Sequence, residues 1–110
     1  MLLRDEFTER RLFGAIAWEA GALELCADVE TDDFSDLHLK FAFVAIRNLQ
    51  ARGEFIDLES ITRELERTGY VQVDVYRIAD TAYEPPYNFE SLLRHDAWWL
   101  RRLARRRGSL

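Results

Sequence analysis

Cysteine is almost missing from the 110-residue sequence: Cys26 is the single one, so no disulfide can form within the chain. It lies in the apolar stretch "LELCADV", without the basic neighbours that lower a thiol pKa. We therefore expect Cys26 to be a small buried hydrophobic residue in a reducing compartment, and not a nucleophile.

Long hydrophobic runs are missing as well. No apolar stretch approaches the roughly 20 residues of a membrane span. The N-terminal "MLLRDEFTERR" carries acids and arginines where a signal peptide needs an apolar run. The sequence therefore predicts a cytoplasmic protein that makes no membrane contact.

The common catalytic and metal-binding motifs are missing too. There is no GxxxxGK[ST] loop, no dinucleotide fingerprint, no CxxC and no HExxH. We expect His38 to be structural and His95 to lie on the surface without a second metal ligand at suitable spacing. Adjacent acids such as Asp32 and Asp33 diverge instead of converging on one substrate. We expect no enzyme activity, no cofactor and no metal.

The residues that are present predict a folded helical protein. Apolar residues make up 48% of the chain and aromatic residues 13%, with two prolines, which is ample material for a core. Apolar positions recur at spacings of three and four, and "YVQVDVY" is the longest alternating segment. We predict an all-α fold, a compact orthogonal bundle of about five to six helices with a longer C-terminal helix. The whole chain, 1–110, is expected to be one domain, with a globular head over about 8–84 and the last helix over about 88–107.

Helix ends can be placed in the first half of the chain. The first helix is expected from about Thr8 to Ala20, and a short second one in "ALELCADV". A third, apolar helix is expected to begin after candidate caps at Asp33 and Ser35 and to end at Gly53.

The segment "GEFIDLESITRELERTG" predicts a helix from about Leu58 to Thr68, capped by Asp57 and closed by Gly69. The residues expected to face the core are Phe55, Ile56, Leu58, Ile61 and Leu65. Those expected to face water are Arg63, Glu64, Glu66 and Arg67. A further helix capped by Asp74 is expected before "EPPYN" ends it.

Charge is distributed unevenly along the chain. Residues 1–90 hold nine basic and 19 acidic residues, whereas residues 91–110 hold six arginines and one aspartate. Because an acidic body repels phosphates, any contact with nucleic acid could come only from the basic tail.

The last helix has an apolar side and, opposite it, Trp98 among cations. The arginines alone also fit a solvated helix end that complements the helix dipole. Exposed Trp and Arg are, however, enriched in binding hot spots, so we predict a protein interface here. The residues assigned to it are Arg94, Trp98, Trp99, Arg101, Arg102, Leu103 and Arg105. We expect this helix to leave apolar surface that favours pairing across a twofold axis.

The order of three motifs is also informative: "ERRLFGAI", then "DDF" followed by a histidine helix, then "LQARGEFIDLESITRELERTG". Over about Glu9 to Arg106 the chain resembles the N-terminal collar domain of the DnaB-type replicative DNA helicases. The matching residues are Glu9, Leu12, Gly14, Asp32, Asp33, Phe34, His38, Leu49, Gly53, Ile56, Asp57, Leu65 and Gly69. The chain departs from the family where Phe55 replaces a proline and where Val73 and Asp74 replace a glycine pair.

The resemblance implies a role in DNA replication without motor activity, since the phosphate loop of the family's ATPase is missing. It implies self-association, as a homodimer or larger, and contacts with a replicative helicase, a primase or a helicase loader. The last helix would correspond to the first arm of the hairpin that pairs subunits in the family's collar.

Three other interpretations stay open from the sequence. The chain is also similar to the helicase-interacting tail of primase. It could be a small nucleic-acid binder that uses "RRLARRR", with Arg102, Arg105 and Arg106, although such a contact would be secondary. Finally, it could be a helical domain with another partner.

Overall fold

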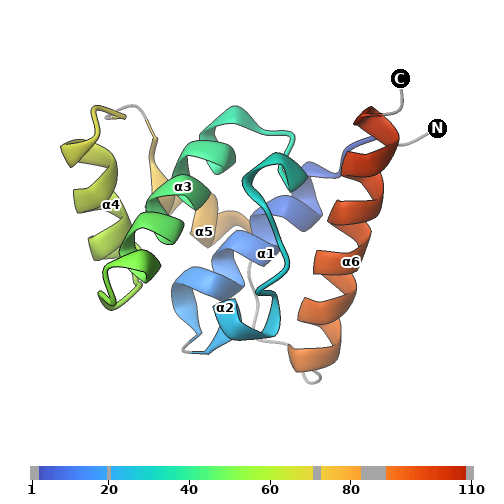
Figure 1. The fold of residues 1–110 in the computed structure, drawn as a ribbon, viewed down its shortest axis with the longest axis horizontal. Helices are drawn as coiled ribbons and strands as arrows, with labels where there is room; N and C mark the ends of the chain where they lie inside the picture. Colours follow the sequence, from blue (N-terminus) through green and yellow to red (C-terminus); the bar gives the residue numbers. More distant parts are fainter. Residues whose placement is uncertain (1–2, 20, 71–72, 83–88, 109–110) are drawn as a thin grey trace.

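The computed structural model describes residues 3–19, 21–70, 73–82 and 89–108, and these residues form helices with no strand. The predicted all-α fold, with a longer C-terminal helix, is confirmed (Figure 1). The elements are α1 (Glu6–Trp18), α2 (Ala22–Leu25), the 3-10 helix η1 (Thr31–Asp33), α3 (Leu37–Ala51), α4 (Leu58–Arg67), α5 (Val75–Ala82) and α6 (Phe89–Gly108).

α1 is the central helix of the bundle. It packs against α2, α3, α5 and α6, while α3 also packs against α4 and η1. In Figure 1, α4 and α6 lie at opposite ends of the molecule. The centre of the core contains Phe13, Phe34 and Phe43, and the rings of Phe34 and Phe43 lie 5.1 Å apart.

Helix starts follow the side chains that can cap them. The Asp57 cap is confirmed, because the Ser60 backbone N–H donates to Asp57 Oδ1 at 2.7 Å. The expected caps of α3 are wrong by a few residues. Asp36 is the cap, accepting from the Leu39 N–H at 3.1 Å, whereas Asp33 accepts from the Glu30 N–H within η1.

Capping side chains also mark the starts of α1 and α5, and glycines mark the ends of α3 and α4. α1 begins before the expected Thr8, because Asp5 accepts from the Thr8 N–H at 3.1 Å. The predicted Asp74 cap is confirmed by a bond of 3.1 Å from the Arg77 N–H. Gly53 and Gly69 have φ of 70° and 93°, the left-handed conformation expected where α3 and α4 end.

A buried carboxylate joins α1 to the start of α3. Glu9 is 0% exposed and accepts hydrogen bonds from the backbone N–H groups of Ser35 and Asp36, at 2.8 and 3.0 Å, and from the Ser35 hydroxyl. These donors include orphan N–H groups beside a helix N-terminus, where a negative charge is favourable. Glu9 therefore fixes the position of α3 relative to α1.

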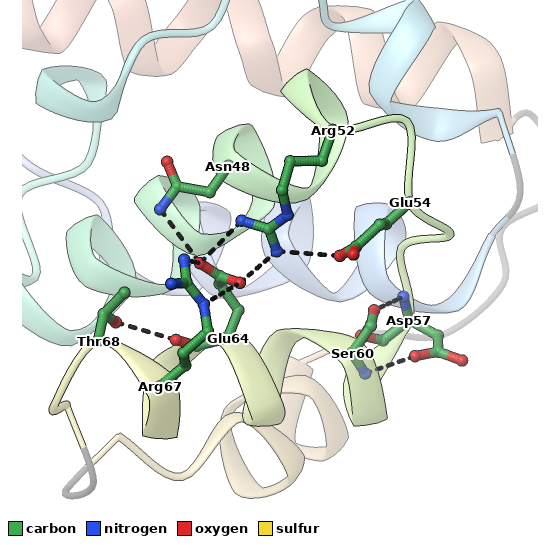
Figure 2. A network of polar contacts seen from close by, with 8 residues as sticks. All are labelled: Asn48, Arg52, Glu54, Asp57, Ser60, Glu64, Arg67 and Thr68. Atoms are coloured by element: carbon green, nitrogen blue, oxygen red, sulfur yellow. Dashed lines mark hydrogen bonds and ion pairs between the residues drawn. The ribbon is translucent and has the colours of Figure 1, made fainter.

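Two expectations for the α4 region are wrong. Phe55 is 74% exposed, because it lies in the turn before α4 and Ile56 is the neighbour that packs on the core. Glu64 is 3% exposed although it was expected to face water. Arg52, the residue that directly follows α3, and Arg67, from the last turn of α4, lie over its carboxylate (Figure 2).

The Glu64 carboxylate is satisfied by several donors. Arg52 Nη1 lies 3.3 Å from Oε1, Arg67 Nε lies 3.3 Å from Oε2, and Asn48 Nδ2 lies 3.5 Å from Oε1 (Figure 2). The hydrogen bonds from Arg52, and then those from Arg67, lower the pKa of Glu64 to about 2. The network ties α4 to the C-terminal end of α3.

We predict that Glu9→Gln lowers the free energy of unfolding by roughly 1–3 kcal/mol. The amide loses the negative charge that strengthens the two backbone hydrogen bonds to Oε1, and it presents an NH2 group to the Ser35 hydroxyl where Oε2 accepted. Urea unfolding followed by circular dichroism measures the change. The exposed Glu6→Gln on the same helix is the matched control and should alter stability little. Equal effects of the two substitutions would contradict the proposed role of Glu9.

We predict that the stabilising effect of Glu64 depends on acid pH. Its pKa is lower in the folded chain than the ordinary 4.5, so the native state binds fewer protons and the contribution is complete above about pH 5. The difference in unfolding free energy between the native chain and Glu64→Gln should shrink as pH falls from about 4.5 towards 2. Glu66→Gln, on the exposed side of α4, is the matched control for the removal of one carboxylate from this helix. A difference that is independent of pH would contradict this assignment.

Candidate protein-association surface

α6 lies along one end of the molecule and packs against α1, α2 and η1 (Figure 1). Its inward side carries Leu93, Leu100 and Leu103, which are all buried. These positions repeat at helical spacing, so the opposite side of the same helix must face away from the core.

A bidentate ion pair holds α6 against α1. Arg11 Nε and Nη2 donate to the two carboxylate oxygens of Asp96 at 2.8 and 2.7 Å. The Asp96 side chain is 2% exposed and that of Arg11 26%. The hydrogen bond to Asp96 raises the pKa of Arg11, so the guanidinium stays charged.

Sequence reasoning missed this pair, although one signal was available. Asp96 is the only acid of residues 91–108, and it lies three residues after Leu93 and four before Leu100, on the apolar side of the last helix. An acid in that position needs a cation from another element, and Arg11 supplies it.

Further polar contacts fix both flanks of α6. Trp99 Nε1 donates to Asp5 Oδ2 at 3.2 Å. Arg107 Nη1 donates to the Leu3 carbonyl at 2.8 Å, and Arg107 Nη2 donates to the carbonyls of Asp32 and Asp33 at 3.2 and 3.3 Å. The helix is thus anchored near its middle and near its C-terminal end.

The outward side presents Trp98, which is 55% exposed. The Arg102 guanidinium lies 5.5 Å from the centroid of its indole ring, a cation–π contact worth about 0.5–1 kcal/mol at an exposed site. The rings of His95 and Trp99 lie 6.0 and 6.3 Å away. Trp98 is therefore held within an aromatic and cationic cluster at the surface.

The structure brings most of the predicted interface residues to this side of the molecule. Arg94, Trp98, Arg102 and Arg105 are exposed and are called the α6 outer face below. Arg101 lies on the flank towards α2, and Trp99 is half-buried.

Leu103 does not belong to the surface. It is 0% exposed and packs inward, since it lies three residues after Leu100 on the apolar side. The expectation that it adds to uncovered apolar surface is wrong, which leaves Trp98 as the large exposed apolar side chain among residues 90–108 of α6.

A groove of about 480 Å³ runs between residues 24–29 and α6. Glu24 and Asp28 line one wall, and the arginines of the α6 outer face line the other. Cys26 also lines the groove but is 3% exposed, as predicted for a small hydrophobic residue. Burial raises the pKa of its thiol to about 11, so it is protonated and a poor nucleophile at neutral pH.

A second groove, of about 510 Å³, lies over the α4 network. Its arginines are paired within the chain: Arg52 with Glu54 and Glu64, Arg67 with Glu64, and Arg63 with Glu59. Each arginine of this groove is thus compensated by an acid of the chain.

Neither histidine joins a metal-ligating cluster, since no group of three His, Cys, Asp or Glu among the described residues could hold a metal ion. His38 and His95 are both exposed. Within the described part of the chain, no helix is long and apolar enough to cross a membrane.

We predict that Arg11→Met loosens α6. Breaking a buried ion pair leaves the Asp96 carboxylate uncompensated, which costs roughly 3 kcal/mol, at the low end of the range because Arg11 is partly exposed. Hydrogen exchange of the α6 amides should speed up more than that of α4. The neighbouring Arg10→Met is the control. Unchanged protection of α6 in Arg11→Met would rule out this anchoring role.

Comparison with known proteins agrees with the resemblance seen in the sequence. A search of curated proteins and a search of solved structures each gave no significant match. The model of the DnaB-like helicase N terminal domain matches residues 2–93. The match thus spans α1 to α5 and the start of α6, and it ends just before the α6 outer face. The chain therefore belongs to the DnaB-like helicase N-terminal domain family.

Proposed function

We propose that the chain is a non-catalytic protein-association domain of the replicative helicase collar type, and that the α6 outer face is its association surface. It acts in the cytoplasm, in DNA replication, by self-association and by contacts with a helicase, a primase or a helicase loader. The observation that carries the proposal is the exposure of Trp98 on a helix that is anchored to the head.

The chemistry of the face supports protein association. A Trp flanked by arginines is the combination most enriched in hot spots, where a large ring fills a pocket of the partner and cations pair at its edge. Trp98 is flanked one turn away on each side by Arg94 and Arg102. Because Glu90 already pairs with Arg94 at 3.1 Å, Arg102, which lies over the Trp98 ring, is the stronger candidate for a contact to a partner.

The anchoring of α6 also supports this role. The Arg11 to Asp96 pair and the Arg107 contacts hold the helix in place before any partner arrives. Binding then costs little ordering of the backbone, which increases the affinity obtained from a small surface.

The buried acids support a non-catalytic role. Glu9, Glu64 and Asp96 each accept hydrogen bonds from donors of the chain itself. A general acid or base needs a perturbed pKa and access to a substrate, and these carboxylates are engaged in holding helices together.

A protein partner is favoured over nucleic acid by the surroundings of the arginines. Glu24 and Asp28 lie across the groove from them, and Asp28 is 3.7 Å from Arg101. These acids weaken the positive potential that phosphates require. A primase-tail-like role would use the same α6 outer face with a helicase collar as partner.

We predict that the native chain self-associates and that Trp98→Ala weakens this association by about 30-fold or more in Kd, as expected for a hot-spot residue. Light scattering on size-exclusion fractions over a range of concentrations measures the effect. Trp18→Ala removes a comparably exposed Trp from α1 and is the matched control. Trp98→Ala should not change the circular dichroism spectrum.

The same pair of variants tests the other partners by titration with helicase, primase or loader. If Trp98→Ala behaves like the native chain in self-association and in all these titrations, the α6 outer face is not the association surface.

A further inference from the structure

The side of α3 that faces away from the core is apolar. Leu37 is 59% exposed and Val44 38%, and Phe41 between them is half-buried. These three residues follow one another at spacings of four and three, so they form one row along the helix, called the α3 outer stripe below. The Tyr70 ring stacks on Phe41 at a centroid distance of 4.1 Å and widens the row. α3 is thus apolar on both sides, although the outer side of a surface helix is ordinarily polar.

The charged side chains of α3 itself are all basic. The helix contains no Asp or Glu, in a chain with 20 acidic residues. Lys40 lies three residues after Leu37 and four before Val44, and Arg47 lies three residues after Val44. At these spacings both cations are neighbours of the stripe on the helix surface. The apolar row is therefore bordered by positive charge.

Arg47 is positioned by uncharged acceptors. Its guanidinium donates to two backbone carbonyls of the segment 27–29 and, at 2.7 Å, to Gln50 Oε1. These oxygens hold the guanidinium in place without neutralising it. Lys40 lies 3.6 Å from Asp32, whose side chain is 92% exposed, and such a surface pair contributes little. Both cations therefore keep charge to offer to a partner.

An apolar row with cations along one edge fits an amphipathic helix that has acids along the matching edge. Leu37 and Val44 are separated by about 10 Å along the helix axis, the length of two turns of a partner helix. The described residues contain no strand, so they offer no sheet edge to an extended peptide. We infer that the α3 outer stripe docks an amphipathic helix of another protein, whose acids pair with Lys40 and Arg47.

This surface is built from other residues than the α6 outer face, so the inference does not rest on the proposed function. Nucleic acid fits the stripe poorly, because phosphates require several cations and gain nothing from an apolar row. A partner helix uses both features, since its apolar side covers the stripe and its acids meet the cations.

The test uses two synthetic helical peptides with the same row of leucines at positions i, i+4 and i+7. One carries glutamates beside the row, and the other carries lysines at the same positions. Fluorescence anisotropy of the labelled peptides at physiological ionic strength measures Kd. The native chain should bind the glutamate peptide at least about tenfold more tightly. Because its net charge of −5 attracts the lysine peptide at long range, only local cations can produce this preference.

Leu37→Glu tests the stripe directly. It places a charge in the apolar row, and it lies in the first turn of α3, where an acid suits the helix dipole and folding should persist. The Kd for the glutamate peptide should rise at least about tenfold. Phe55→Glu changes a comparably exposed apolar residue outside the stripe and should bind like the native chain. Lys40→Glu should abolish the preference between the peptides. Circular dichroism checks the folding of each variant.

The inference is overturned if the glutamate peptide binds no better than the lysine peptide, or if Leu37→Glu binds it like the native chain. Trp98→Ala should also bind it like the native chain, and a loss there would place the peptide on the α6 outer face. If Leu37→Glu dissociates an oligomer of the native chain, a second copy occupies the stripe and the inference is wrong. If neither peptide binds while Trp98→Ala weakens self-association, the inference is wrong and the proposed function stands.

Discussion

The Arg11 to Asp96 ion pair decides what α6 presents to other molecules. It fixes the rotation of the helix about its own axis, because Asp96 must point at α1 for both carboxylate oxygens to be satisfied. Trp98 lies two residues further along, on roughly the opposite side of the helix, and so faces outward. One buried charge thus couples the packing of the head to the surface of the last helix, and the same contact that stabilises the fold exposes the side chain proposed for association.

Much of the fold could be predicted because helix signals are local. Asp57, Gly53 and Gly69 end or begin helices through their own backbone geometry and side-chain atoms, which need no distant partner. The match of the family model to residues 2–93 is consistent with the order in which these helix starts and ends follow one another along the chain. The cap of α3 was misplaced because Asp33, Ser35 and Asp36 all have side chains that can cap, and tertiary contacts decide among them. The Ser35 hydroxyl donates to Glu9 and the Asp33 carboxylate accepts from the Glu30 N–H, which leaves Asp36 as the cap.

The candidate site could be predicted only in part. The helical spacing of α6 places Trp98 outward and Leu103 inward, and the grouping of Leu103 with exposed residues ignored that spacing. The burial of Glu64 could not be predicted, because it depends on Arg52 from the end of α3 as well as on Arg67 of its own helix. The position of Asp96 on the apolar side indicates a buried ion pair, but it does not identify Arg11 as the partner. The position of Glu24 and Asp28 beside the last helix could not be predicted from the sequence either, because about 70 residues separate Asp28 from the arginines that face it across the groove.

The central claim is that Trp98, and not another exposed aromatic residue, meets the partner. Fluorine NMR of protein labelled with fluorotryptophan tests it directly, with the resonances of Trp18, Trp98 and Trp99 assigned by Trp→Phe substitutions. The account predicts that the Trp98 resonance moves with protein concentration, or on addition of helicase, primase or loader, while that of Trp18 stays in place. A Trp98 resonance that is unchanged under all these conditions would contradict the account.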